Sequence, residues 1–391
     1  MKSLILPLLC FLFAACTPDV PKPLKPAFFC WETTLDLTPE SRDLLDDLGC
    51  KKLYVKILDV GKNAESGEIE PYSHTAVTDT AELAGLEIIP TVFITNEVFQ
   101  NIAEAKMDWL VGKIVACAQA PPGPPRWGGE DAPLDSRDTE RDAKRVSGGE
   151  EDAPLAFRNT KGASSPPLLG GALIDCDWTP STQEAFFLFL KKMRRKLPPG
   201  TTLCATIRLH QYKFPQKTGV PPVDRGMLMC YNTGDVDEEG EHNTIFHPDD
   251  ALKYLDGAPK NYPLPLDLAL PLFSWGLVFR EGELWKIIPG PLPFEAMRNS
   301  GKWIENPILD HFSAQLWELK EGTFLGGHYL RPGDHLRVSV TSPELLFKAA
   351  SLARKLDLAD DANLAFFHLG IAKSEHFSAQ LLDSVCKTVR N

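Results

Sequence analysis

Hydrophobic and polar positions alternate along most of the chain in a way that predicts short strands separated by helices. The strand-like runs are rich in apolar, β-branched and aromatic residues, and turn-forming residues such as Gly, Pro, Asn and Asp bound them. We identify eight such runs, at residues 28–33, 53–59, 87–95, 171–178, 202–210, 227–232, 266–273 and 364–369.

Helical periodicity fills the intervals between these runs. Two of the helices share a start signal, because Thr38 and Ser342 are each followed by Pro and Glu, which is typical of an N-cap and a first helical turn. Eight strand-then-helix units predict an α/β fold, the (β/α)8 TIM barrel. An open doubly wound sheet is the alternative, although no G-x-G-x-x-G follows the first strand. The clearest helical segments are residues 38–48, 98–118, 181–196, 343–356 and 375–385.

The first residues predict a lipoprotein leader rather than part of the fold. Lys2 gives a basic start, residues 4–13 are almost wholly apolar, and Cys16 follows two alanines, an ending that resembles a bacterial lipobox. We expect residues 1–15 to be a signal peptide, and Cys16 to carry a lipid that anchors the protein to a membrane of the bacterial cell envelope. A plain signal peptide that contains a cysteine is the alternative. Residues 16–27 contain four prolines and predict an extended tether.

Two segments interrupt the barrel pattern expected over residues 28–391. Residues 119–167 contain eight prolines and sixteen charged residues, which predicts a disordered insertion. This insertion precedes the fourth strand, so we expect it on the barrel face formed by the amino ends of the strands. Residues 274–342 follow the seventh strand and contain hairpin-like patterns. They predict a small α+β insertion on the opposite face, where it forms one wall of a cleft.

Composition and charge restrict the partners. The chain has 41 basic and 53 acidic residues and a net charge of −12, so nucleic acid is not an expected partner. The sequence contains no C-x-x-C pair, so a structural zinc site is not predicted. We expect a monomer with no cofactor and no metal. Cys30, Cys176, Cys204 and Cys230 lie in apolar runs and are interpreted as buried small hydrophobic residues.

The fourth expected strand carries the most informative polar residues. Asp175 and Asp177 are two residues apart and therefore point to the same face of a strand. Catalytic groups of such barrels stand at the carboxyl ends of the strands. Two carboxylates this close should raise the pKa of one of them, which suits acid–base chemistry. The alternative is that both are structural and are held by Arg208 and backbone N–H groups.

Two short motifs resemble those of the family 18 glycoside hydrolases, the chitinases. Residues 172–179 are similar to the strand-4 motif D-x-x-D-x-D-x-E, in which Asp175 and Asp177 match the second and third acids. Residues 229–232 are similar to the strand-6 motif Met-x-Tyr-Asp, in which Tyr231 matches and Asn232 replaces Asp. The resemblance implies that Asp177 orients a substrate N-acetyl group and that Tyr231 assists it. The chain as a whole also resembles lipoproteins of Bacteroidetes, a resemblance that offers no activity to transfer to this chain.

The sequence departs from the chitinase motif at two positions. The first Asp of the motif falls on Ala172, and its catalytic Glu falls on Thr179. A threonine cannot protonate a leaving glycosidic oxygen at neutral pH. A proton donor would therefore have to come from another strand end, and Glu32, Asp59 and Glu97 are the available carboxylic acids.

The fifth expected strand adds a basic pair next to these carboxylates. Arg208 and His210 are two residues apart and should both face the Asp pair. Arg208 is the expected partner of Asp175 or Asp177. His210 is a candidate general acid or base, and a hydrogen-bonded barrel histidine is the alternative. A metal site formed by His210 and both aspartates would require the three side chains to converge.

Aromatic residues and amides near the strand ends suggest a ligand pocket. Sugar rings stack on aromatic side chains through their C–H faces, although any single Trp can equally pack in the core. The main hypothesis is a lipid-anchored glycoside hydrolase-like barrel that acts on glycans, including those with N-acetylhexosamine. The alternative is a non-catalytic cell-surface protein that binds glycans or serves as a scaffold. The candidate substrate-binding residues are Trp31, Trp178, Arg208, Gln211, Tyr231, Asn232 and Trp275.

Overall fold

The computed structural model describes residues 23–77, 80–119, 168–240, 242–307, 312–372 and 377–390. The expected signal peptide and Cys16 lie outside these residues, as does the expected disordered insertion except for Gln119, which ends helix α2. The first strand begins at Lys25, so the last three residues of the expected tether belong to the barrel. Within the described residues, no helix has both the length and the apolar character needed to span a membrane.

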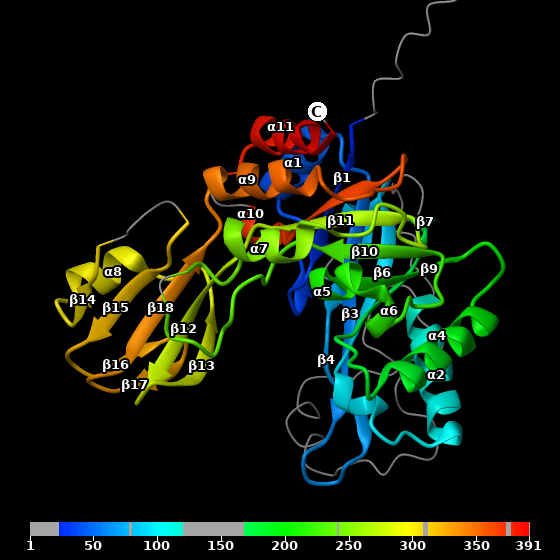
Figure 1. Cartoon of the computed structure of the whole chain (residues 1–391), viewed down its shortest axis with the longest axis horizontal. Coiled ribbons are helices and arrows are strands. Elements are labelled where there is room, and N and C mark those ends of the chain that lie inside the picture. The colour runs from blue at the N-terminus through cyan, green and yellow to red at the C-terminus, as the bar shows by residue number, and fades with distance from the viewer. Residues whose placement is uncertain are drawn as a thin grey trace, which may run out of the picture.

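Eight parallel strands form a closed barrel (Figure 1). Each strand pairs with the next, and the last strand pairs with the first through Leu364 and Pro26. Closure confirms the TIM barrel and excludes the open sheet. In order around the barrel, the strands are β1 (Lys25–Cys30), β3 (Lys52–Lys62), β6 (Glu87–Ile94), β8 (Gly171–Asp175), β9 (Thr202–Arg208), β10 (Arg225–Met229), β11 (Leu266–Pro271) and β19 (Asn363–Phe367).

Helices surround the barrel. Thr38 and Ser342 cap α1 and α9 as expected, since each side chain accepts a hydrogen bond from the backbone N–H three residues on. The expected helix 98–118 is divided into a 3-10 turn, η2 (Asn96–Phe99), and a helix that begins at Glu104. The main helices are α1 (Pro39–Asp47), α2 (Glu104–Gln119), α4 (Gln183–Lys196), α7 (Pro248–Leu255), α9 (Pro343–Ala353) and α11 (Ala379–Arg390).

Shorter helices, strands and a 3-10 turn lie in the connections between these main elements. Helix α5 follows β9 without a break, which matters for the site below. These elements are β2 (Thr34–Leu35), β4 (Ile69–His74), β5 (Ala76–Val77), η1 (Thr80–Leu83), β7 (Leu168–Leu169), α5 (Leu209–Lys213), α6 (Pro215–Thr218) and α10 (Leu369–Ala372).

The segment between β11 and α9 forms its own small unit, which lies to the left of the barrel in Figure 1. It is an antiparallel sheet of order β13-β12-β18-β15-β14 with a separate hairpin. Trp317, Leu336 and Val338 belong to its own apolar core. Its elements are β12 (Ser274–Arg280), β13 (Glu283–Pro289), α8 (Phe294–Asn299), β14 (Trp303–Glu305), β15 (Gln315–Leu319), β16 (Thr323–Leu325), β17 (His328–Leu330) and β18 (His335–Val340).

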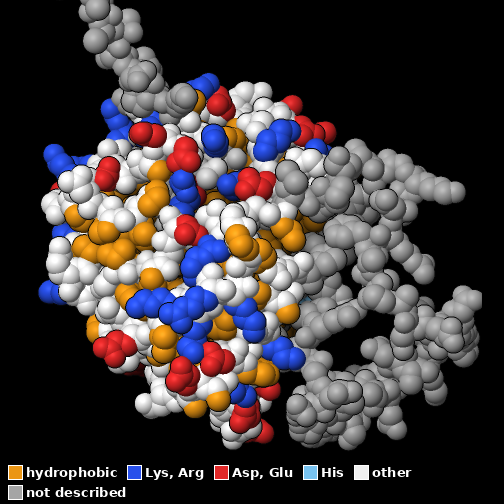
Figure 2. All heavy atoms as spheres, turned by 90° about the vertical axis from the view of Figure 1, so that its right-hand side faces the viewer, with side chains coloured by type: hydrophobic (Ala, Val, Ile, Leu, Met, Phe, Trp, Pro, Cys, Tyr) orange, Lys and Arg blue, Asp and Glu red, His pale blue; other side chains and the backbone are white. Residues whose placement is uncertain are grey.

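Alternation along the strands produces two layers of core. One side of each strand packs under the helices, and the other fills the barrel, where Phe29, Tyr54 and Leu173 are buried. The four cysteines expected to be buried are buried. Figure 2 views the side opposite the sheet insertion, where basic side chains lie beside acidic and hydrophobic ones. The interior of the barrel is filled by side chains, so the strand ends are where a site of a TIM barrel is expected.

The N-cap of α9, Ser342, gives a test of the helix start predicted from the sequence. Leu345 N–H donates to Ser342 Oγ at 3.1 Å. We expect Ser342→Ala to lower the free energy of unfolding by about 1 kcal/mol, because one backbone donor of the first turn loses its partner. Urea unfolding would measure this, with Ser342→Asp, which retains an acceptor, as the control. Equal midpoints for the wild type and the alanine variant would contradict the cap.

Candidate carbohydrate-binding cleft

A cleft of about 530 Å³ lies at the carboxyl ends of β8, β9 and β10. The insertion supplies part of its wall through Trp275 on β12 and Ile287 on β13. The cleft therefore lies where the strand order predicts a barrel site, and the insertion borders it as expected. The barrel strands and the segments that follow them supply Asp177, Trp178, Thr179, Arg208, His210, Gln211, Tyr231 and Asn232.

Asp177 and Arg208 form a bidentate ion pair inside the cleft. Arg208 Nη2 donates to Asp177 Oδ2 at 2.7 Å, and Arg208 Nε donates to the other carboxylate oxygen. The Asp177 side chain is 52% exposed, whereas that of Arg208 is 21% exposed. The Asp177 carboxylate raises the pKa of Arg208. The pairing expected between Arg208 and one of the two aspartates is thus present, and it fixes both charged groups in place.

Asp175 lies behind this pair rather than in the cleft. Its side chain is buried and accepts a hydrogen bond from Thr206 Oγ1 at 2.7 Å. Burial is the main cause that raises the pKa of Asp175 to about 6, and the Asp177 carboxylate raises it further against the opposing effect of Arg208. The expected upward shift is therefore found, but burial contributes more than the like charge. Asp175 can influence Asp177 and Arg208 without touching a ligand.

Thr179 stands where the chitinase motif has its catalytic acid. Its hydroxyl lies 2.9 Å from Ser181 Oγ, and Asn96 Nδ2 donates to it at 3.5 Å. These neighbours form a hydroxyl and amide network that carries no ionisable proton near neutral pH. Among the described residues that line the cleft, Asp177 has the one carboxyl group.

The alternative acids are not brought to Asp177. Glu32, Asp59 and Glu97 are not among the residues that line the cleft. Asp59 is buried and pairs with Lys56 Nζ at 2.7 Å, and the same ammonium lies 5.4 Å from the Trp31 ring. The Glu32 carboxylate packs against Gly370, where even a methyl group would clash. None of these three acids lines the cleft, so the structure does not place a replacement acid there from among them.

Two expected substrate-binding residues line the cleft, but both are buried and hydrogen-bonded within the protein. Trp178 is 3% exposed, stacks on Phe186 and donates its indole N–H to the Thr218 carbonyl at 2.9 Å. Gln211 is buried, accepts from Arg208 N–H at 2.8 Å and donates to the Trp178 carbonyl at 3.3 Å. The packing alternative holds for Trp178, and Gln211 helps to position Arg208.

His210 does not extend strand β9. The strand ends at Arg208, and His210 lies in the helix that follows, where it is exposed at the cleft. Partial burial and the Arg208 guanidinium lower the pKa of His210. Asp175 and Asp177 bind Thr206 and Arg208 instead of converging with this imidazole. The described residues therefore provide no support for a metal centre made of these three side chains.

Tyr231 and Trp275 remain as ligand candidates at the cleft. Tyr231 is buried between Phe273 and Phe367, and no described residue accepts or donates a hydrogen bond at its hydroxyl. Trp275 is half-buried, packs edge-on against Phe273 and donates to Thr244 Oγ1 at 3.0 Å. A buried hydroxyl without a protein partner is costly, so a ligand or solvent group at this position would satisfy it.

Comparison with known proteins gives similarity at the level of the fold. No family model and no curated protein matches the chain. The chain is similar in fold to chitinases. A chitinase from Bacteroides thetaiotaomicron is 11% identical and aligns over 93% of this chain and 97% of its own with a TM-score of 0.45. The family 18 chitinase ChiB of Flavobacterium johnsoniae is 10% identical and aligns over 93% of this chain and 94% of its own, with a TM-score of 0.40.

A third solved structure of similar fold is that of a spore cortex-lytic enzyme. The spore cortex-lytic enzyme SleL of Bacillus cereus is 14% identical and aligns over 92% of this chain and 73% of its own, with a TM-score of 0.46. The barrel itself follows from the strand pairing, and the roles of residues must be argued from the cleft.

Five residues that line the cleft were not predicted from the sequence as site residues: Leu209, Gly234, Val236, Tyr254 and Ile287. Tyr254 comes from α7, and Ile287 comes from the hairpin of β12 and β13. Ile287 lies in the segment that was expected to form the wall, so its position in the hairpin was the available signal. Tyr254 carried no signal, because its helix follows a long connection from β10 that the sequence pattern does not orient.

Proposed function

We propose that this protein binds a carbohydrate chain in the cleft and does not hydrolyse it there. The observation that carries the proposal is Tyr231, which lines the cleft and has a buried hydroxyl without a hydrogen-bond partner among the described residues. Beside it are the Asp177–Arg208 pair and the aromatic wall of Trp275. Apolar walls with a few fixed polar groups suit a ligand with C–H faces and hydroxyl groups. Lipidated Cys16 would hold this site at a membrane of the cell envelope.

The absence of a second carboxyl group supports binding without hydrolysis. Glycoside hydrolysis requires a proton donor at the leaving oxygen, in most families with a second carboxylate nearby. Within the described part of the chain, the cleft offers Asp177 alone, and Arg208 holds both of its oxygens. Thr179 at the position of the acid cannot supply the proton.

The Tyr231 hydroxyl provides the sharpest test. We expect Tyr231→Phe to weaken binding of N-acetylglucosamine oligosaccharides by about three- to tenfold, because one hydrogen bond to the ligand is lost. The variant should be at least as stable as the wild type, since the removed hydroxyl has no described partner. Calorimetric titration would measure affinity, and urea unfolding would measure stability.

Tyr262→Phe is the matched control. The Tyr262 hydroxyl is also buried without a described partner, but this residue packs on Tyr212 and does not line the cleft. Its loss should leave affinity unchanged. If no N-acetylglucosamine oligosaccharide binds the wild type, carbohydrate binding is contradicted. If mass spectrometry shows products from the wild type and none from Asp177→Asn, the protein is a hydrolase and the second half of the proposal is wrong.

A further inference from the structure

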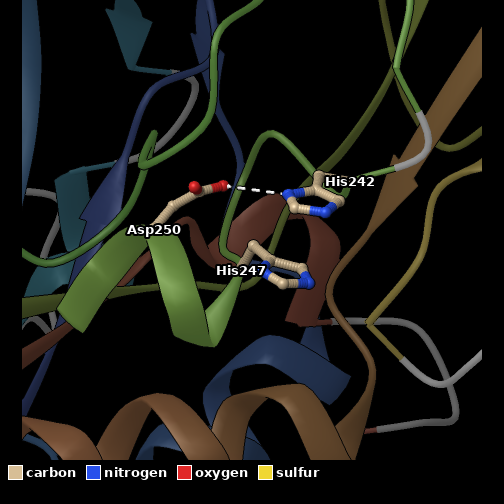
Figure 3. Close-up of side chains that lie close together, drawn as sticks. All are labelled: His242, His247 and Asp250. Atoms are coloured by element: carbon tan, nitrogen blue, oxygen red, sulfur yellow. Dashed lines mark ion pairs between the residues drawn. The ribbon is translucent and has the colours of Figure 1, made fainter. Parts of the chain in front are cut away.

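Three metal-ligating side chains lie together between β10 and the first turn of α7 (Figure 3). His242, His247 and Asp250 each offer one ligand atom, and these atoms all lie within 4.8 Å of one another. We propose that His242, His247 and Asp250 form a site for a divalent transition-metal ion, with zinc as the first candidate. This site is separate from the Asp177–Arg208 pair and does not depend on the proposed carbohydrate binding.

The donor set indicates the class of ion. Two imidazole nitrogens and one carboxylate oxygen suit zinc and its neighbours in the first transition row, whereas magnesium and calcium prefer all-oxygen sites. Three protein ligands leave a fourth tetrahedral position for water or another ligand. His242 and Asp250 border a cavity of about 660 Å³, so this position has access to solvent.

The backbone holds two of the ligands in place. His247 is the N-cap residue of α7, and its backbone N–H donates to Thr233 Oγ1 at 2.9 Å. Asp250 lies in the first turn of the same helix, and both side chains are buried. The third ligand approaches from the preceding loop, where His242 Nδ1 lies 3.5 Å from Asp250 Oδ2. Binding would therefore recruit one exposed side chain to two buried ones.

Ion binding requires one side-chain movement. The His242 and His247 rings are stacked, with centroids 4.0 Å apart and planes 9° apart. An ion lies near the plane of each imidazole that binds it, so two parallel rings cannot share one ion without rotation. The His242 side chain is 60% exposed and can turn toward the carboxylate. Lys253 pairs with Asp250 at 2.7 Å, but its side chain is 70% exposed, and such pairs contribute little to stability.

A bound ion would join parts of the fold that border the carbohydrate cleft. His242 forms an isolated β-bridge with Ser313 of the insertion. The cavity beside the ligands shares Asn232, Gly234 and Tyr254 with the cleft. The ion would thus fix α7 to a loop that contacts the insertion, next to the site proposed to bind sugar.

Zinc titration of the full chain without an added histidine tag tests the proposal. After treatment with a chelator, calorimetry with zinc chloride should show one ion per chain. His242→Ala should weaken this binding at least tenfold and should keep the fold, because the His242 side chain is 60% exposed. Asp250→Asn should weaken it as well. His74→Ala removes an exposed histidine on β4 outside the cluster and should bind zinc as the wild type does.

Thermal unfolding gives an independent measurement. Zinc should raise the unfolding temperature of the wild type and of His74→Ala but not that of His242→Ala, because an ion that binds the folded state alone stabilises it. The proposal is overturned if the wild type binds no zinc at millimolar concentration. It is also overturned if His242→Ala, with an unchanged circular dichroism spectrum, binds zinc as tightly as the wild type. Tyr231→Phe should retain zinc binding, which separates this outcome from failure of the proposed function.

Discussion

Asp267→Ala is expected to lower the free energy of unfolding by about 3 kcal/mol, one of the two largest effects that we predict. Asp267 lies on β11 near the amino end of the barrel and is 2% exposed. Its carboxylate accepts hydrogen bonds from Arg225 Nη1 at 2.9 Å, Asn363 N–H at 2.8 Å and the Tyr54 hydroxyl at 3.3 Å. The alanine variant would leave these donors unpaired at the end of four strands.

Asp361→Asn is the matched control for this prediction. Asp361 also pairs with Arg225, at 2.7 Å, but its side chain is 66% exposed. An exposed ion pair contributes at most about 1 kcal/mol, so this variant should remain near the wild-type stability. Urea unfolding of the three proteins would give the comparison. Similar losses for both variants would show that the charge of Arg225, rather than the buried network of Asp267, determines the effect.

The strand pattern was sufficient to predict the barrel. All eight expected strands form, because each combines a short apolar run with turn residues at both ends. The helix start signals at Thr38 and Ser342 were also sufficient, since capping depends on a few adjacent residues. The ends of the helices and strands were predicted less accurately than their presence and order. The pattern could not show that residues 96–99 form a separate 3-10 turn, because apolar spacing alone does not distinguish it from the helix that follows.

The candidate site was predicted in part. The Asp177–Arg208 pair followed from the neighbouring order of β8 and β9, although β8 ends at Asp175 and Asp177 lies just beyond it. The position of His210 did not follow, because the chain turns into a helix directly after Arg208 and the strand period no longer applies. Trp178 could not be assigned from sequence, because its burial depends on the packing of Phe186 from α4. The pair of His247 and Asp250 at the start of α7 was missed altogether, although their spacing of three residues places them on one helical face.

Asp175 gives the second large expected effect, which depends on pH. Its pKa is about 6 in the folded protein, above the ordinary value of 3.8. The folded state therefore binds more protons than the unfolded state between these pH values, and the contribution of this group to stability is complete below pH 3.8 and is lost as the pH rises through 6. A shift of about two pKa units corresponds to roughly 3 kcal/mol.

Asp175→Asn removes this dependence, because the neutral amide can still accept the Thr206 hydrogen bond and carries no buried charge. We expect the variant to be more stable than the wild type by up to about 3 kcal/mol above pH 7, with the difference shrinking toward zero near pH 4. Urea unfolding of both proteins across this pH range would measure the difference in unfolding free energy. The contributions of titrating groups that behave alike in the two proteins cancel in this difference. A difference that stays constant with pH would contradict the raised pKa. The expected result would mean that the buried charge behind Asp177 and Arg208 is retained at the expense of stability, as is typical of residues that serve a binding site.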